Sequence, residues 1–164
     1  MNILASRGAQ YSLHQQFLFN FNNWLKDSVS LANETLGSTV AAATDPATVG
    51  LVGPTANTIT FDCIPLPLGA TIIGGDLVVE TAYVGPTTAT ITLGTAAVPA
   101  AYLAATSVTA VGRTPILLTT PLASLDGSNV RMTLTYTGGN ATAGRVRVRV
   151  SYMVDGRINE VQIT

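Results

Sequence analysis

Apolar and polar residues alternate in two stretches near the C-terminal end of the chain, 129–137 and 145–154. On the apolar side these stretches carry valine, leucine, methionine and tyrosine. On the polar side they carry threonines and arginines, including Arg145, Arg147 and Arg149. A period of two is typical of antiparallel strands with one face in the core and one in water. We therefore predict two half-buried strands here.

The residues between the two stretches, 138–144, are rich in glycine and include an asparagine. Such residues adopt the backbone angles that turns require. A symmetric turn would join the two strands as a hairpin, with Thr135 opposite Arg147 and Thr133 opposite Arg149. The polar members of both strands would then share one face.

From residue 57 onward the chain repeats short runs rich in Thr, Val and Ile, each bounded by Gly, Pro or Asp-Gly. Besides the two stretches above, the predicted strands are 58–64, 71–84, 87–94, 114–120 and 157–163. No helical periodicity separates them, which argues against parallel strands joined by helices. We predict an all-β fold, an antiparallel two-sheet sandwich of jelly-roll-like form.

The N-terminal segment has two possible structures. Its apolar residues recur at three- and four-residue spacings, as on one side of a helix: Leu13, Phe17, Phe21, Trp24 and Leu25. The phrase FLFNF also alternates, as a strand does. Residues 38–57 are small, polar and interrupted by Pro and Gly, as in a linker. We expect a partly helical or extended N-terminal arm and linker over 1–56, followed by a β-sandwich domain over 57–164.

Composition limits the function classes. The chain has 164 residues, of which 47% are hydrophobic and 10% charged, against about 25% charged in an average soluble domain. A surface poor in charge favours self-association or docking on another protein. Eight basic and nine acidic residues give a formal net charge of -1, so the molecule as a whole does not attract a polyanion. No signal peptide or transmembrane run is evident, so we expect no membrane partner.

The arginine row has three interpretations: a solvated strand face, a charged contact with another subunit or a capsid, and a nucleic-acid surface. Alternate residues of a strand lie about 7 Å apart, so the three guanidinium groups would form a line. Single-strand binding favours aromatic residues interleaved with basic ones, whereas this face offers threonine. Nucleic acid is therefore the least favoured partner.

Candidate catalytic groups are few. His14 is the only histidine and lies far in sequence from residues that could complete a triad. Asp76 and Glu80 lie on one side of a predicted strand, about 13 Å apart, too far for a glycosidase pair. We expect them to face water or to pair with arginines. Gly74 and Gly75 lack the Lys-Ser and the helix start of a phosphate-binding loop.

The single Cys63 excludes an internal disulfide and cannot build a zinc site alone. We expect it to be a small buried residue in its strand. The sequence therefore predicts no metal site, no cofactor and no enzymatic activity.

Two long phrases carry a family resemblance: GGDLVVETAYVGPTTATITLGTAAVPAAYLAATSVTAVGRTPI and VRMTLTYTGGNATAGRVRVRVSYMVDGRINEV. Over residues 57–161 the chain resembles the small β-sandwich virion proteins of tailed bacteriophages. In that group a phrase like TITLG precedes AxYLAATS and a Gly-Arg, and the C-terminal phrase reads like TAGRVRVRVxYxxDGRxNE. The resemblance implies a head decoration or cement protein on the outer surface of the capsid. Such a protein binds the major capsid protein and itself, often as a trimer.

The resemblance fixes no binding residues, so the candidates come from the chain itself. Large aromatic residues dominate interfaces, which makes Phe17, Phe21 and Trp24 candidates for docking on the capsid. The candidates for a charged contact are Arg145, Arg147 and Arg149. Two alternative functions stay open: a tail or head-fibre component that binds host glycans, and a nucleic-acid-binding head protein that uses the face of Arg145–Arg149.

Overall fold

The structure is a computed structural model. It describes residues 12–23, 25–29, 31, 33–35, 48–50, 57–118, 125–126 and 129–154. All regular structure in this part of the chain is β strand. Within it no helix is long and apolar enough to cross a membrane.

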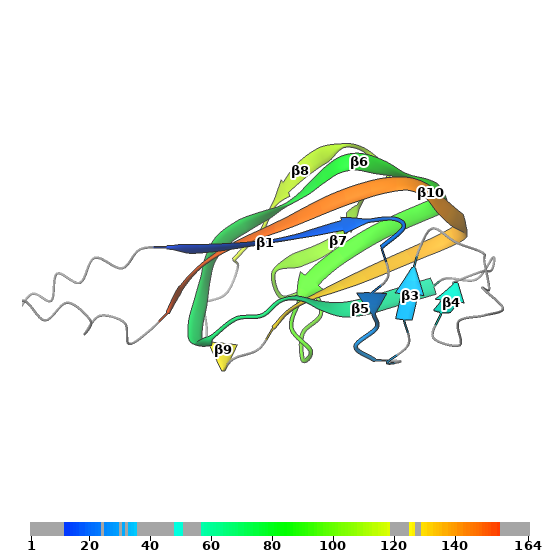
Figure 1. Ribbon diagram of the computed structural model, residues 1–164. Helices are drawn as coiled ribbons and strands as arrows, with labels where there is room; N and C mark the ends of the chain where they lie inside the picture. Colours follow the sequence, from blue (N-terminus) through cyan, green and yellow to red (C-terminus); the bar gives the residue numbers. More distant parts are fainter. Residues whose placement is uncertain are drawn as a thin grey trace, which may run out of the picture.

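Two long strands form the centre of the molecule. They are β6 (Leu68–Gly94) and β10 (Val130–Val154), which pair antiparallel along almost their whole length. The pairing is interrupted by register shifts around 137–145, where the two-stranded ribbon bends (Figure 1). Each long strand therefore contributes one half to each of two layers.

The predicted hairpin at 138–144 is wrong. These residues belong to β10, which continues through them and stays paired with β6. Thr135 is opposite Thr58 and Thr90, not Arg147. Glycines in this segment bend the strand without reversing it. Likewise, the predicted strands 71–84 and 87–94 are parts of the single strand β6, and the predicted strand 157–163 lies outside the described residues.

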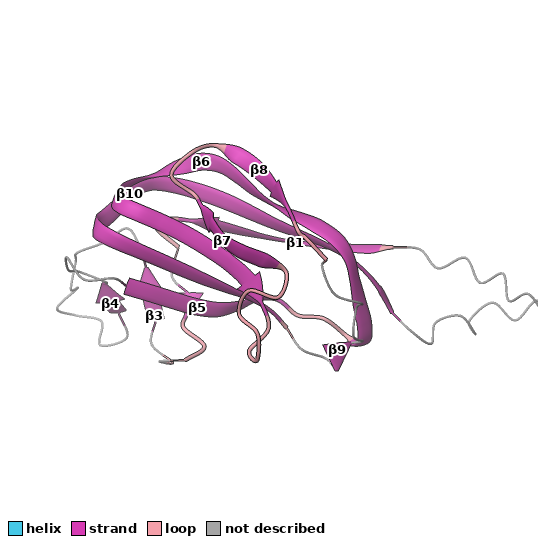
Figure 2. Ribbon diagram, turned by 180° about the vertical axis from the view of Figure 1, so that it is seen from behind, coloured by secondary structure: helices cyan, strands magenta, loops and turns pink. Residues whose placement is uncertain are grey.

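Shorter strands complete the two layers. The upper layer in Figure 1 adds β1 (Leu13–Asn20) beside β10 and β8 (Gly112–Pro115) beside β6. Strand β9 (Leu125–Asp126) pairs with the first residues of β6, at the lower edge of the molecule in Figure 1. The lower layer adds β5 (Asn57–Ile64) beside β10 and β7 (Leu103–Ser107) beside β6. Figure 2 shows β7 and β8 from the opposite side.

Among the described residues, seven strands form this one curled sheet. A second, small sheet contains β2 (Leu25–Lys26), β3 (Asn33–Thr35) and β4 (Thr48–Gly50). The predicted all-β antiparallel class is confirmed. The two layers are the folded halves of one sheet, because the long strands run through both.

The core lies between the two layers and follows the predicted alternation. Even-numbered residues of β10 point inward on both sides of the bend and are buried: Met132, Leu134, Tyr136, Val146, Val148, Val150 and Tyr152. From β6 the core receives residues such as Leu77 and Ile91. Burial of this apolar surface, at roughly 25 cal/mol per Å², is the main stabilisation of the fold.

The N-terminal segment is extended where it is described. The helical alternative is wrong for Leu13–Asn20, because this segment is strand β1 and pairs with β10 over eight residues. Phe19 is buried, and its ring centroid lies 5.4 Å from that of Phe61. Phe17 also contacts Phe61, at 5.5 Å. A part of the predicted arm is therefore a strand of the main sheet.

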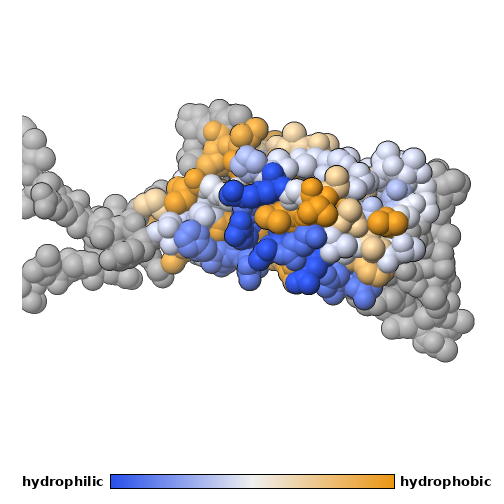
Figure 3. Space-filling view, turned by 90° about the horizontal axis from the view of Figure 1, so that it is seen from above, coloured by the Kyte–Doolittle hydropathy of each residue, from blue (hydrophilic) through white to orange (hydrophobic). Residues whose placement is uncertain are grey.

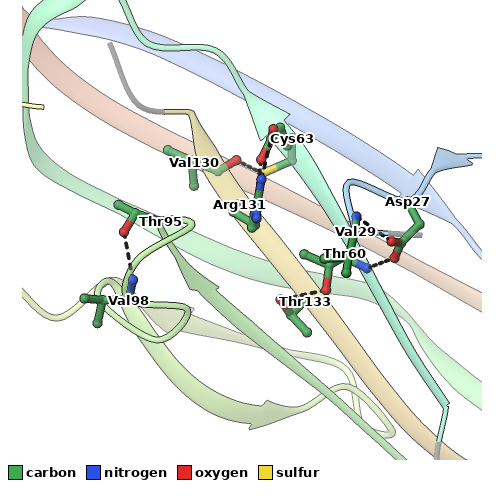
Figure 4. A network of polar contacts seen from close by, with 10 residues as sticks. Asp27, Val29, Thr60, Cys63, Thr95, Val98, Val130, Arg131 and Thr133 are labelled. Carbon is green, nitrogen blue, oxygen red and sulfur yellow. Dashed lines mark hydrogen bonds and ion pairs between the residues drawn. The ribbon is translucent and has the colours of Figure 1, made fainter. Parts of the chain in front are cut away.

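A buried carboxylate fastens the chain after β2 to the lower layer (Figure 4). The side chain of Asp27 accepts hydrogen bonds from the backbone N–H of Thr60, at 2.6 Å, and of Val29, at 2.7 Å. The backbone N–H of Ser28 donates to the carbonyl of Thr60. These contacts cover backbone groups on the outer edge of β5, which would otherwise be open to other strands.

The bend of β10 requires glycine at 144, which predicts a large effect of Gly144→Ala. Gly144 has a φ of 145°, and an added Cβ would lie 2.6 Å from the ring of Tyr83. We expect Gly144→Ala to lower the free energy of unfolding by about 1 to 3 kcal/mol, measured by urea denaturation. Gly74→Ala is the matched control, since nothing lies within 4 Å of its added Cβ. Equal midpoints for the two variants would contradict this account of the bend.

Candidate functional site

A bulge in β6 sets the geometry of the candidate site. Ile72 pairs with Tyr152, but Gly74 pairs with the preceding residue, Ser151. Ile73 is therefore the extra residue, and it is partly exposed. A bulge of one residue exchanges the two faces of all residues that follow it.

Because of this change of faces, the carboxylate of Asp76 lies on the outside of the upper layer. Beyond the bulge, Leu77 points into the core and Asp76 lies on the outer face, opposite Arg149. Gly75 permits the close approach of β10, because a Cβ at this position would lie 2.2 Å from the carbonyl oxygen of Arg149. Without the bulge, Asp76 would share the inward face of Ile72.

Two arginines bind Asp76. Arg149 donates from Nε to Oδ1 at 2.7 Å and from Nη2 to Oδ2 at 2.5 Å. Arg113, which lies on β8, donates from Nε to the same Oδ2. The guanidinium groups cover the carboxylate so fully that Asp76 is 2% exposed, whereas the side chains of Arg113 and Arg149 are 67% and 48% exposed.

The second carboxylate of β6 repeats this arrangement. Glu80 Oε2 forms an ion pair with Arg145 Nε at 2.8 Å, and Oε1 forms one with Arg147 Nη2. Each carboxylate is thus shared by two arginines, which come from β8 and β10 for Asp76 and from β10 alone for Glu80. The prediction that Asp76 and Glu80 face water or pair with arginines is confirmed in its second form.

These six residues form one surface feature, which we call the charged band: Arg113, Arg145, Arg147, Arg149, Asp76 and Glu80. Seen from above, strongly hydrophilic residues cross the middle of the upper layer with hydrophobic residues beside them (Figure 3). The band holds four arginines and two carboxylates, a surplus of two positive charges in a chain of net charge -1. Its charge is therefore opposite in sign to that of the whole chain.

The arginines act on the titration of Asp76. Hydrogen bonds from Arg149 lower the pKa of the carboxyl below its ordinary value of 3.8, and those from Arg113 act in the same direction. Burial raises the pKa and opposes this effect in part. The carboxylate is therefore ionised at neutral pH, and its charge holds the two guanidinium groups in place.

A surface hollow of about 650 Å³ opens beside Asp76. Arg113 and Arg149 contribute to its lining, as do His14, Gln16 and Ser151. His14 Nδ1 lies 2.8 Å from the hydroxyl of Ser151. The hollow thus combines two guanidinium groups with other side chains that can form hydrogen bonds.

The structure separates the predicted aromatic candidates from the arginines. Phe17 and Phe21 are partly buried and pack against the hydrophobic core. The arginines lie on the outer face of the same layer. Trp24 lies outside the described residues, so its position is left open. Sequence reasoning missed Arg113, because nothing local to β8 indicates that it approaches Asp76.

Cys63 is buried, as predicted, and its thiol lies 3.2 Å from the carbonyl oxygen of Val130. Burial raises the pKa of this thiol to about 12, so it is neutral at physiological pH. Among the described residues no group of three His, Cys, Asp or Glu side chains could hold a metal ion.

No protein-family model and no curated protein matches the chain. A solved structure does. A chain of the cyanophage Pam1 capsid asymmetric unit is similar over 94% of this chain and 93% of that chain, with a TM-score of 0.54 and 19% sequence identity. The likeness is one of fold.

Asp76→Asn should destabilise the protein in a pH-dependent way. Because the folded pKa of Asp76 is depressed, its contribution is present above the unfolded value near 3.8 and is lost as the pH falls through the lower folded value. At pH 7 we expect a loss of about 1 to 3 kcal/mol in unfolding free energy. The gap between wild type and variant should narrow as the pH falls below the unfolded pKa and close below the folded pKa.

Urea denaturation at a series of pH values measures this gap. Asp62→Asn is the control, since Asp62 pairs with a single arginine, Arg131, and is 35% exposed. It should cost less than about 1 kcal/mol. A gap for Asp76→Asn that is unchanged from pH 7 to pH 2 would show that the ion pairs do not stabilise the fold.

Proposed function

We propose that this chain is a structural protein of a tailed-phage virion, which decorates the outer surface of the capsid and braces neighbouring subunits of the major capsid protein. The observation that carries the proposal is the likeness of nearly the whole fold to a chain of a phage capsid asymmetric unit. The sequence resemblance over 57–161 supports the same class independently.

The proposed mechanism is mechanical. A sandwich whose two layers share their longest strands cannot slide one layer over the other without breaking the β6–β10 ladder. Such a body transmits force between the subunits that it contacts. As a homotrimer it would bind through several small interfaces at once, which gives lasting attachment from weak single contacts. No catalytic step and no cofactor enters this function.

The charged band favours a protein partner over nucleic acid. All four arginines are already engaged by Asp76 or Glu80. A phosphate backbone approaching this face would meet two carboxylates as well as four guanidinium groups, so attraction and repulsion offset each other in part. This supports the capsid interpretation of Arg145, Arg147 and Arg149.

Co-sedimentation with empty shells of the major capsid protein from the same phage tests the proposal. We expect the protein to travel with the shells at a fixed ratio and to raise the temperature at which they break, because many bridges must then fail together. A protein that stays at the top of the gradient at micromolar concentration would contradict the proposal.

The proposed trimer is measured separately. Sedimentation velocity of the free protein should give about three times the mass of one chain, 16.9 kDa. If the protein sediments as a monomer at every concentration up to that of the shell experiment, the proposed multivalent attachment is wrong.

A further inference from the structure

We propose that the hollow beside Asp76 is a carboxylate-binding site, and that its occupant is an acidic side chain of the capsid protein on which this chain docks. The inference deepens the proposed function, and the part that concerns the capsid rests on it. It starts from the two guanidinium groups that line the hollow.

The first step is the count of hydrogen-bond donors. Arg149 uses Nε and Nη2 on Asp76, which leaves Nη1. Arg113 uses only Nε on Asp76, which leaves the Nη1–Nη2 edge of its guanidinium group. Within the part of the chain that the structure describes, these remaining donors have no hydrogen-bond partner. The open edge of Arg113 has the geometry that receives a carboxylate through two parallel hydrogen bonds.

The second step is that both side chains are held before any ligand arrives. Asp76 is buried beneath them and binds both through one shared oxygen, Oδ2. An exposed arginine normally loses rotamer freedom on binding, at a cost of about 0.5 to 1.5 kcal/mol. Here folding has already restricted the rotamers of both arginines in part. A second carboxylate therefore binds an ordered pair of arginines.

The third step is the charge at the hollow. Arg113 and Arg149 carry two positive charges against the single negative charge of Asp76. One further carboxylate neutralises the remainder, and His14, Gln16 and Ser151 supply hydrogen-bonding groups around it. A single acidic group therefore brings the net charge of the site to zero.

The balance of charges at the hollow also favours an isolated carboxylate over a nucleic-acid strand as the ligand. A strand brings successive phosphates and requires a groove of positive charge to follow them. Next along the band, Glu80 lies between Arg145 and Arg147 and opposes the next phosphate. A carboxylate on a protein loop enters the hollow alone and avoids this repulsion.

The test measures binding of a hexaglutamate peptide to the full-length protein by isothermal titration calorimetry, with hexaglutamine as the uncharged control. We expect hexaglutamate to bind and hexaglutamine not to bind. Affinity should fall as the ionic strength rises from about 0.05 M to about 0.5 M, because the open donors are exposed. Absence of hexaglutamate binding at low salt would overturn the site.

Arg113→Gln should weaken hexaglutamate binding at least about tenfold, since it removes charge-assisted hydrogen bonds. Arg113→Lys keeps the charge but not the paired donors, and should also weaken binding. The matched control is Arg131→Gln, which removes an arginine on the lower layer, paired with Asp62, and should leave binding unchanged. Equal losses for Arg113→Gln and Arg131→Gln would show that binding is non-specific and would overturn the proposal.

Two further measurements distinguish a carboxylate from a nucleic acid as the ligand, and distinguish the carboxylate site from the proposed capsid function. A single-stranded oligonucleotide of equal charge should bind more weakly than hexaglutamate, and tighter binding through Arg113 would overturn the carboxylate assignment. Arg113→Gln should also reduce retention on capsid shells, and unchanged retention would overturn the capsid occupant. If wild-type protein binds hexaglutamate but no shells, the proposed function fails while the carboxylate site stands.

Discussion

The continuous pairing of β6 with β10 is the constraint on which the rest of the structure depends. It supplies the middle strands of both layers, so the upper and lower layers are parts of one hydrogen-bonded ladder. The bend at 137–145 then folds this ladder so that its inner face closes on itself and encloses the core. Shorter strands add to edges that the ribbon has already created. Stability and surface geometry therefore both derive from one long-range pairing.

A bulge in that pairing gives the outer face its charge pattern. The extra residue Ile73 moves the acidic residues after it to the solvent side, where the arginines of β10 already point. Asp76 and Glu80, four residues apart on one strand, then each meet two arginines, from β8 and β10 for Asp76 and from β10 alone for Glu80. The band results from combining strand alternation with local interruptions, since a second register shift leaves Glu80 between the residues paired with Val146 and Arg145. A regular strand with the same composition would have placed the carboxylates against the core.

Alternation along the chain predicts much of this structure, because the inward positions of β10 and the shared side of Asp76 and Glu80 depend only on a period of two. Connectivity is not predicted, since glycine-rich residues 138–144 suit a tight turn and a bend equally well. Choosing between them requires knowing that β6 is long enough to accompany β10 through the bend. Arg113 could not be assigned either, because its approach to Asp76 depends on the pairing of β8 with β6 across 37 residues. The local sequence pattern thus predicts which face of a strand a residue occupies, whereas long-range strand pairing determines which residues it contacts.

The two outer faces of the sandwich differ in what they can recognise. The outer face of the lower layer carries threonines that hydrogen-bond across strands, such as Thr60 with Thr133 and Thr88 with Thr137. These pairs satisfy one another, and the Asp62–Arg131 ion pair of the same layer balances one positive with one negative charge. The upper face is also largely satisfied internally, but each of its carboxylates is shared by two arginines. Because the upper face keeps a small surplus of positive charge, it favours selective binding over tight binding. A polyanion meets repulsion from Asp76 and Glu80. A single carboxylate meets an ordered pair of guanidinium groups. Under the proposed function, a face of this kind suits a protein that binds one position on a repeating surface and does not bind nucleic acid.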